Sequence, residues 1–554
     1  MNPYDFDPNL QEIFNKTFGN ITSNHWRSWL YISSSKEYEE VCLKLAELSG
    51  VEDILNKIKS KRTDPKEFSI DINDFLQNSS SSKLTIFCHS SGTTINKKSA
   101  LKWFHMSKDV VQRNWAPGMQ AIFESSGLDS KSSAIIFVPS RVDFDGISYE
   151  NGKKHVKMYT SEFSQRLMLS LIKPKSYLLY EYRNSKNLEI ISKILSLDNI
   201  NIISAPAATV LGWINLEKFK AGIKSSLKTK PAIINPVYEE LVSLIKQDGL
   251  TDATKKIQSL LFKKLANACL VFSISSLSED DWSQIRNYMN WQKGSEKFTN
   301  LYVASEAGPV AASLHKGSFD LARERKMVLF PLFIAVLKHE GQKELISKSK
   351  ANRGELCISR LDGNNHLINI ELGDIITVLS NKGLPQIDGK ILRSSFTLKY
   401  PIIISKEVKY PSKHFVLVGD YFKFNNLEII DPKRIKNCIS SKLDYSLDSL
   451  LLIKSGNTSH SHWILYLQQN NKKEISKGSK LNKIMVDCSD VLNIEEALRD
   501  GYLEIRMTKE SPISYLYPRS EMLRKVQDGE IPKGILKKWP LYVVIPNLKK
   551  NKKK

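Results

Sequence analysis

The spacing of hydrophobic positions along the chain changes near residue 84. Residues 1–80 carry apolar side chains three and four positions apart, as in EYEEVCLKLAELSGVEDILNKIK at 37–59, and this spacing predicts helices. A run of serines, Ser79 to Ser82, ends this part, and such runs mark loops. The first 80 residues are therefore expected to be mainly helical.

Short apolar runs alternate with amphipathic segments from residue 84 to residue 305. The runs, each expected to form a strand, are LTIFC, AIIFVPS, SYLLYEY, INIISAP, ACLVFSIS and NLYVAS. Strands that alternate with helices are typical of an α/β domain with a largely parallel sheet. From about residue 355 onward, strands follow with fewer helices between them, in ELCISRL, HLINIEL, DIITVL, FVLVG and HWILYLQQ. We therefore expect a change of architecture before the end of the chain.

The longest apolar run, MVLFPLFIAVL at 327–337, predicts buried structure rather than a membrane span. It has about half the length that a helix needs to cross a bilayer, and it contains Pro331. We expect a buried strand pair or a bend. The N-terminal stretch MNPYDFDPNL has neither a basic start nor an apolar core, so no signal peptide is expected.

Composition and charge place the chain among ordinary folded proteins. Its 554 residues favour two to four domains, and 41% hydrophobic with 25% charged residues is the balance of a globular protein. The net charge of +22 raises the question of a nucleic-acid partner. The lysines, however, are spread along the chain, and the one dense run lies at 549–554. The charge therefore does not favour nucleic-acid binding.

The six cysteines indicate a reducing compartment. They lie far apart, with no CxxC pair and no Cys/His spacing typical of zinc sites. Reduced thiols of this kind are usual in cytoplasmic proteins. We expect a cytoplasmic protein with no zinc site.

The stretch SSGTTINKK at 90–98 follows the first predicted strand and has the composition of an anion-binding loop. Small residues let backbone N–H groups approach a phosphate, hydroxyls add hydrogen bonds, and Lys98 adds charge. A polar turn with no ligand is one alternative. A Walker A loop, GxxxxGK(S/T), is another, but Lys97 stands where its second glycine is needed.

Further motifs follow in a fixed order, and together they resemble the adenylate-forming superfamily of acyl-CoA synthetases, phenylacetate-CoA ligases and acyl-protein synthetases. The loop is similar to (S/T)SGTTGxPK, with Ile95 and Lys97 in place of Gly and Pro. NLYVASEAGP at 300–309 is similar to YGxTE, GELCISR at 354–360 to the GEL strand, and INIELGDIITV at 369–379 to YxTGD. YLYPRSEMLRKVQDGEIP at 515–532 is similar to the late LPRTxxGKxxR segment.

The resemblance implies a nucleotide site. Tyr302 would stack on adenine, Ser305 would contact the α-phosphate, Glu306 would hold Mg²⁺ and Asp374 would accept hydrogen bonds from the ribose hydroxyls. The loop residues that match the family are Ser90, Ser91, Gly92, Thr93, Thr94 and Lys98.

The resemblance also implies a hinge and a late catalytic cation, and each has two candidates. Lys390 in DGKILR stands near the place of the family's hinge Gly-Arg, while VGDYFKFNNLEIIDPKRI at 418–435 offers Asp420 instead. In the late motif, Arg524 lies at the ungapped position and Lys525 requires a one-residue insertion. Either could approach the carboxylate and phosphate oxygens during adenylation.

The implied fold is a large α/β N-terminal adenylation domain with mixed, largely parallel sheets and a smaller, mobile α+β C-terminal domain. We expect the first domain over residues 1–388, the second over 389–540 and a basic tail over 541–554.

The implied reaction uses ATP and Mg²⁺ to convert a small-molecule carboxylate into an acyl-adenylate, with release of pyrophosphate. The acyl group would then pass to CoA, to a thiol of a carrier or other protein, or to an amine. FVPSRVDFDG at 137–146 favours the branch of phenylacetate-CoA ligases, auxin-amide synthetases and acyl-protein synthetases. Cys438 and Cys488 are candidates for an acyl-carrying thiol, although each also fits a buried small residue.

Two other classes of function stay open. Substitutions at nearly every motif leave room for a catalytically degenerate member of the superfamily that binds nucleotide or acyl groups as a scaffold. A P-loop-type nucleotide hydrolase is the other alternative. The presence of both Glu306 and Asp374 favours an active AMP-forming ligase, because a scaffold has no need of both acids.

Overall fold

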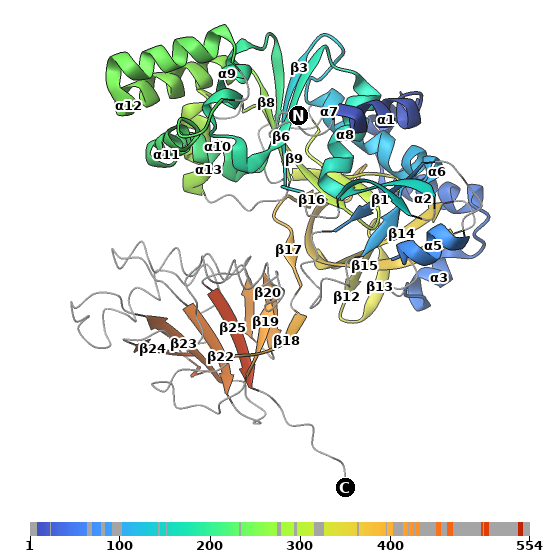
Figure 1. Cartoon of the computed structure of the whole chain (residues 1–554). Helices are drawn as coiled ribbons and strands as arrows, with labels where there is room; N and C mark the ends of the chain where they lie inside the picture. Colours follow the sequence, from blue (N-terminus) through green and yellow to red (C-terminus); the bar gives the residue numbers. More distant parts are fainter. Residues whose placement is uncertain are drawn as a thin grey trace. The chain divides into compact units, whose positions relative to one another are not determined.

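The computed structural model divides the chain into two compact units (Figure 1). The first comprises residues 1–90, 102–372 and 376–391, and the second comprises 91–101, 373–375 and 392–554. The residues that the structure describes are 8–22, 24–63, 69–78, 84–90, 102–141, 145–150, 152–231, 234–273, 279–292, 296–314, 326–362, 365–394, 396–402, 414–418, 420–424, 427–430, 450–455, 462–468, 500–501, 503–508 and 541–546.

The first unit begins with helices, as the spacing of apolar positions predicts. These are α1 (Pro8–Phe18), the 3-10 helix η1 (Asn24–Tyr31), α2 (Ser35–Leu48), α3 (Ile54–Ser60) and α5 (Ile72–Asn78). In α2, Tyr38, Cys42 and Ala46 recur every four residues and are all buried, so the helix has one apolar face. The side chain of Ser34 caps α2 by accepting a hydrogen bond from the Glu37 N–H.

A four-stranded sheet follows, in the order β2-β1-β5-β4. Its strands are β1 (Thr85–His89), β2 (Trp103–His105), β4 (Gly146–Glu150) and β5 (Lys153–Tyr159). β1 pairs parallel with β5 and antiparallel with β2. The predicted phosphate loop therefore follows the carboxyl end of β1, which runs parallel to β5.

The larger sheet has a parallel part, as predicted, made of β3 (Ser133–Val138), β6 (Ser176–Glu181), β7 (Ile200–Ser204), β8 (Cys269–Ser273) and β9 (Phe298–Ala304). It continues with antiparallel pairs through β10 (Gly308–Ala312), β11 (Lys326–Leu329), β16 (Gln386–Asp388), β15 (Asn365–Ser380), β14 (Arg353–Asp362), β12 (Ile334–His339) and β13 (Gln342–Leu345). The α/β fold class with mixed sheets is confirmed.

Helices pack on both faces of the parallel part (Figure 1). On β3, Ala134, Ile136 and Val138 belong to one buried cluster, whereas Ile135 and Phe137 belong to another. This alternation follows from the period of two along a strand. One face carries α7 (Ala116–Ser125) and α8 (Thr160–Ile172), and the other carries α9 (Leu188–Ser196), α10 (Ala207–Ile214), α11 (Leu216–Ser226), α12 (Pro236–Leu265) and α13 (Glu279–Tyr288).

The apolar run at 327–337 forms β11, a short bend and the start of β12, and all of its residues are buried. The prediction of a strand pair or bend is therefore confirmed. The two strands expected in HLINIEL and DIITVL are one strand, β15. Its backbone takes positive φ at Asn369 and Gly373, and such irregular positions interrupt the apolar alternation that marks a single strand.

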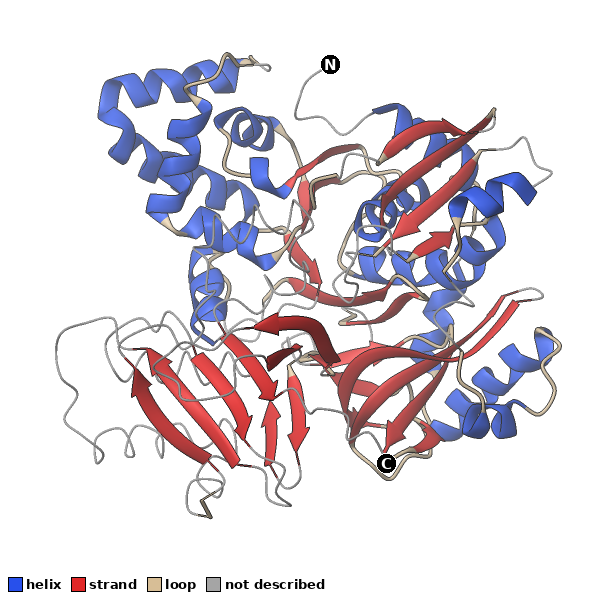
Figure 2. Cartoon of the chain, turned by 60° about the horizontal axis from the view of Figure 1, so that its bottom comes forward, coloured by secondary structure: helices blue, strands red, loops and turns tan. Residues whose placement is uncertain are grey.

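The described residues of the second unit are mainly strands (Figure 2). A six-stranded sheet has the order β18-β19-β25-β22-β23-β24. These strands are β18 (Phe396–Ile402), β19 (His414–Val418), β22 (Leu450–Ser455), β23 (His462–Gln468), β24 (Leu503–Thr508) and β25 (Leu541–Pro546). Two short strands, β20 (Tyr421–Phe424) and β21 (Leu427–Ile430), pair separately, and β17 (Leu392–Arg393) pairs with β15 at 374–375.

Four described cysteines, Cys42, Cys88, Cys269 and Cys357, are buried thiols outside any disulfide. Burial raises the pKa of Cys42 and Cys357 to about 12 and that of Cys269 to about 11, so these thiols stay protonated at neutral pH. Within the described residues, no helix is long and apolar enough to cross a membrane.

Candidate functional site

A tight turn after β9 carries two of the predicted site residues, Ser305 and Glu306. β9 is parallel to β8 and antiparallel to β10, and the Ala307 N–H donates to the Ala304 carbonyl at 3.1 Å to close the turn. Gly308 follows with φ +120°, and a Cβ there would lie 2.9 Å from the backbone oxygen of Asn114. The turn thus stands at the carboxyl end of a parallel strand, where α/β sheets commonly bind ligands.

Glu306 lies beside two cationic side chains. Its Oε1 is 3.6 Å from Nζ of Lys102, and the two side chains are 18% and 25% exposed. Nη1 of Arg360, on β14, donates to the Glu306 backbone oxygen at 2.6 Å. Lys102 is the first described residue after the predicted phosphate loop. Within the first unit, Lys102 and the turn after β9 are therefore in contact although they lie about 200 residues apart in the sequence.

The Glu306 carboxylate has the chemistry of a magnesium ligand. Mg²⁺ is commonly held by one or two protein carboxylates together with phosphate oxygens and waters. Within the described part of the chain, no group of three or more His, Cys, Asp or Glu side chains is arranged to hold a metal by itself. A single, partly exposed carboxylate such as that of Glu306 is of the kind that holds Mg²⁺ together with phosphate oxygens.

Tyr302 and Ser305 differ in exposure. The Tyr302 side chain is 2% exposed and belongs to the buried cluster that also holds Leu301 and Ala304, whereas Ser305 is half-buried. Stacking of Tyr302 on adenine requires neighbouring side chains to uncover a face of the ring. That role stays a prediction.

Asp374, in the second unit, is held by a second ion pair. Its Oδ1 is 3.2 Å from Nη1 of Arg393, in the β15–β17 register that pairs these two residues. Gly373 before it has φ +71°, a conformation that favours glycine. The Gly373 carbonyl accepts hydrogen bonds from both the N–H (2.8 Å) and the hydroxyl (3.1 Å) of Ser394. This turn therefore fixes Asp374 against β17.

The sequence offered Lys390 and Asp420 as rival hinge residues, and the structure gives them different surroundings. Asp420 Oδ2 accepts from the Arg393 N–H at 3.2 Å, and its own N–H donates to the Arg393 carbonyl at 2.8 Å. Asp374, Arg393 and Asp420 thus form one cluster in the second unit. Lys390 belongs to the first unit, where its N–H donates to Asp388 Oδ1 at 2.8 Å.

Sequence reasoning missed Lys102, Arg360 and Arg393. Arg360 and Arg393 are the last residues of the quoted motifs GELCISR and DGKILR. The sequence did not indicate that they contact Glu306 and Asp374. Lys102 stands just beyond the loop motif and gave no signal of its own.

Some predicted residues lie outside the described part of the chain. Ser90, at the start of the loop, is described and half-buried. The others lie in segments that the structure does not describe: Ser91, Gly92, Thr93, Thr94, Lys98, Cys438, Cys488, Arg524 and Lys525.

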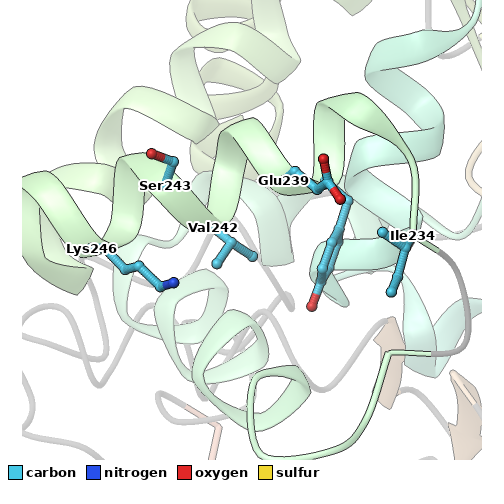
Figure 3. A pocket seen from close by; sticks show the side chains of 6 residues that line it. Ile234, Glu239, Val242, Ser243 and Lys246 are labelled. Atoms are coloured by element: carbon cyan, nitrogen blue, oxygen red, sulfur yellow. The ribbon is translucent and has the colours of Figure 1, made fainter.

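A shallow pocket of about 290 Å³ lies elsewhere in the first unit, along the first turns of α12 (Figure 3). It is lined by Ile234, Tyr238, Glu239, Val242, Ser243 and Lys246. Figure 3 shows Glu239 and Lys246 about two turns apart along the helix, with Val242 and Ser243 between them. None of the predicted nucleotide-binding residues that the structure describes lines this pocket.

No protein-family model matches the sequence, and no curated protein matches it. Solved structures do match the chain. A GH3.15 acyl acid amido synthetase in complex with 2,4-DB is 13% identical, with 92% of this chain and 90% of that chain covered and a TM-score of 0.44. A 2-hydroxyisobutyryl-CoA ligase in the postadenylation state is 8% identical, with 95% and 93% covered and a TM-score of 0.42.

A third match is an acetoacetyl-CoA synthetase from Streptomyces lividans, 10% identical, with 81% of this chain and 56% of that chain covered and a TM-score of 0.40. All three belong to the adenylate-forming superfamily that the sequence motifs resemble. At identities of 8–13% and TM-scores of 0.40–0.44, these similarities carry no argument about activity. Any proposal about the activity of this chain therefore has to be argued from the chain's own residues.

Proposed function

We propose that this protein activates a carboxylic acid with ATP. It forms an acyl-adenylate, releases pyrophosphate, and transfers the acyl group to a thiol or an amine. The proposal rests on the order of the sequence motifs and on the chemistry of the residues that they mark.

The observation that carries the proposal is the contact between Lys102 and Glu306. The predicted phosphate loop begins at Ser90, and the chain is described again at Lys102, whose ammonium lies 3.6 Å from the carboxylate that would hold Mg²⁺. A magnesium–nucleotide complex needs a phosphate-binding loop and a metal-binding carboxylate side by side. The contact of Lys102, four residues after Lys98, with Glu306 supports the proposal that both motifs serve one nucleotide site.

In the first step, an oxygen of the substrate carboxylate attacks the α-phosphorus of ATP. The bond from that phosphorus to the bridging oxygen breaks, and pyrophosphate leaves with the electron pair. Bound Mg²⁺ would neutralise charge on the phosphate oxygens. Glu306 would orient it, while Lys98 and either Lys525 or Arg524 would contact phosphate or carboxylate oxygens.

Asp374 and Arg393 fit the ribose end of the nucleotide. An ionised carboxylate has about four lone-pair sites, so Asp374 can accept hydrogen bonds from ribose hydroxyls while it stays paired with Arg393. The pair holds the carboxylate in one orientation before ligand arrives. Preorganisation of this kind lowers the entropic cost of binding.

In the second step, a thiol or amine attacks the acyl carbon of the adenylate, loses its proton, and expels AMP. The acyl-adenylate is a mixed anhydride that water would hydrolyse, so the site must exclude water between the two steps. CoA, a carrier-protein thiol and a small amine all have the required nucleophile. A mobile second domain would provide closure.

Carboxylate-dependent exchange of labelled pyrophosphate into ATP tests this function. Purified protein is incubated with ATP, Mg²⁺, labelled pyrophosphate and each member of a panel of carboxylic acids. We expect exchange with at least one acid and none without acid. Nucleotide binding with no exchange across the panel would favour the scaffold alternative, and formation of ADP in place of AMP would favour a P-loop hydrolase.

A further inference from the structure

A buried asparagine, Asn114, lies on the helix that packs against the turn after β9. This helix runs over residues 108–125 and contains one π-helical turn, Val111–Trp115, in which the Ala116 N–H donates to the Val111 carbonyl five residues before it. Single π-helical turns are rare within α-helices and frequently lie at functional sites. Asn114 is therefore a candidate for a role that the sequence motifs do not indicate.

Asn114 stands where the pattern of the helix predicts an apolar side chain. Val110 and Trp115 are buried, whereas Gln112 and Arg113 are exposed. Asn114 follows Val110 by one helical turn and so lies on the same, buried face, where it is 2% exposed. Its side-chain oxygen Oδ1 is fully buried and has no hydrogen-bond partner among the residues that the structure describes. Burial of an amide oxygen without a partner is destabilising, so packing alone does not explain this residue.

The backbone of Asn114 is in close contact with the turn of the candidate site. A Cβ at Gly308 would lie 2.9 Å from the Asn114 carbonyl oxygen. One turn further along the helix, a Cβ at Gly118 would lie 2.7 Å from the side chain of Pro309. Glycine at both positions allows the helix and the turn to approach this closely. Asn114 is thus packed against the turn that carries Glu306.

The surroundings of Asn114 favour an organic group over a phosphate as its ligand. The helix and the turn share one buried apolar cluster, which includes Trp115, Ala116, Ala307, Val310 and Phe330. Sites for organic ligands are typically apolar, with a few polar groups that fix the orientation of the ligand. Phosphate groups, by contrast, are typically held by cations and N–H donors. A single uncharged amide among apolar side chains therefore suits the acyl part of an acid better than the phosphates of ATP.

We propose that Asn114 is a specificity-determining residue that accepts a hydrogen bond from a hydroxyl group on the carboxylic acid. A polar side chain kept in an apolar face against the local pattern is expected where it serves function. A hydroxyl group can donate to Oδ1, which then gains in the complex the partner that it lacks in the protein alone. An acid with a methyl group in that place leaves Oδ1 without a partner. The inference rests on the proposed function for the reaction at this turn, and it names a class of substrate, the hydroxy acids.

The test compares acids in pyrophosphate exchange, in pairs in which a hydroxyl group replaces a methyl group. The pairs are lactate with isobutyrate, salicylate with ortho-methylbenzoate, and para-hydroxybenzoate with para-methylbenzoate. We expect the wild type to have the higher kcat/KM for the hydroxylated acid in at least one pair. Asn114→Leu, which keeps the branching of the side chain, should reduce that preference about tenfold, the equivalent of about 1.4 kcal/mol. The KM for ATP should stay within about threefold, because the lost contact is to the acid.

Gln120→Met is the matched control. Gln120 lies on α7, is 6% exposed, and has an Oε1 that likewise has no hydrogen-bond partner in the described part of the chain. It follows Gly118 by two residues, so its side chain lies on the face of the helix opposite to Pro309. Gln120→Met should therefore leave the preference between the acids unchanged. Thermal unfolding checks that both variants are folded, and Asn114→Ala takes the place of Asn114→Leu if the latter does not fold.

Three results would overturn the inference. The first is a wild type that prefers the hydroxylated acid in none of the pairs, the second is an Asn114→Leu enzyme that keeps the wild-type preference, and the third is an equal loss of preference in Gln120→Met. If the wild type shows no exchange with any acid, the proposed function fails, and the same pairs are tested as ligands by their effect on the melting temperature. A rise caused by a hydroxylated acid in the wild type but not in Asn114→Leu would support the inference, and the absence of such a difference would refute it.

Discussion

Replacing Glu306 by glutamine removes one negative charge from the turn after β9 and keeps the size of the side chain. Its effect on stability should be small, because the ion pair with Lys102 is 3.6 Å long and both side chains are partly exposed. A gross Coulomb energy of about 4–5 kcal/mol at that distance, for an effective dielectric constant near 20, is largely offset by desolvation. Net values for pairs of this kind are about 1 kcal/mol, and the melting temperature should fall by no more than about 2–4 °C.

The effect of Glu306→Gln on catalysis should be much larger. Removal of one group that stabilises developing charge in a transition state commonly costs about 10²–10³-fold in rate, so pyrophosphate exchange should fall by about that factor. Glu371→Gln is the matched control, since Glu371 is a similarly buried carboxylate paired with Lys338 and Arg62, both at 2.9 Å. The reasoning is refuted if Glu306→Gln keeps a third or more of the exchange rate, or if Glu371→Gln loses as much as Glu306→Gln.

Three further predictions concern other residues. Asp374→Ala should raise the KM for ATP about tenfold or more, because the ribose contacts are lost. The KM is measured by pyrophosphate-exchange kinetics, and an unchanged KM would show that Asp374 is not part of the nucleotide site. Gly308→Ala should lower the melting temperature more than Gly127→Ala does. Both glycines have positive φ, but of the two only a Cβ at residue 308 would lie close to a backbone atom, 2.9 Å from the Asn114 oxygen. An equal fall in melting temperature for both variants would show that the structure relaxes around this contact. Burial alone would raise the pKa of Glu162, but Arg166 and Arg141 outweigh burial and hold that pKa below 4.5. The stabilisation that ionised Glu162 gives the folded protein is therefore complete above pH 4.5. It is lost as the pH falls through the pKa that Glu162 has in the folded state. Glu162→Gln should therefore be less stable than the wild type at neutral pH, with a shallower acid loss in denaturant titrations, and parallel acid profiles would contradict this.

The sequence predicted the strands well because their apolar runs are short and bounded by polar turns. β1, β3 and β6–β9 each overlap a run that the hydrophobic pattern marked, and their ends differ from those of the run by no more than two residues. β15 was expected as two strands, because the residues at Asn369 and Gly373 break the alternation although the backbone pairing continues. Local pattern thus gives the elements, whereas pairing between distant strands decides whether they are continuous.

The site was harder to predict because its contacts join residues that no local pattern connects. The motifs marked Glu306 and Asp374, but their partners Lys102 and Arg393 depend on the turn after β9 and on the pairing of β15 with β17. Burial of Tyr302 also depends on packing that a strand pattern does not specify. The order of the motifs therefore identifies the candidate carboxylates, whereas the cations paired with them are identified only from contacts in the folded structure.

Transfer of oxygen from the carboxylate to AMP tests the central claim most directly. An acid that supports pyrophosphate exchange is prepared with ¹⁸O in its carboxyl group and taken through a full turnover with ATP, Mg²⁺ and a thiol or amine acceptor. Attack of the carboxylate on the α-phosphorus, followed by cleavage at the acyl carbon, predicts AMP that carries one ¹⁸O atom on its phosphate. AMP without ¹⁸O, or ADP as the nucleotide product, would contradict formation of an acyl-adenylate by this protein.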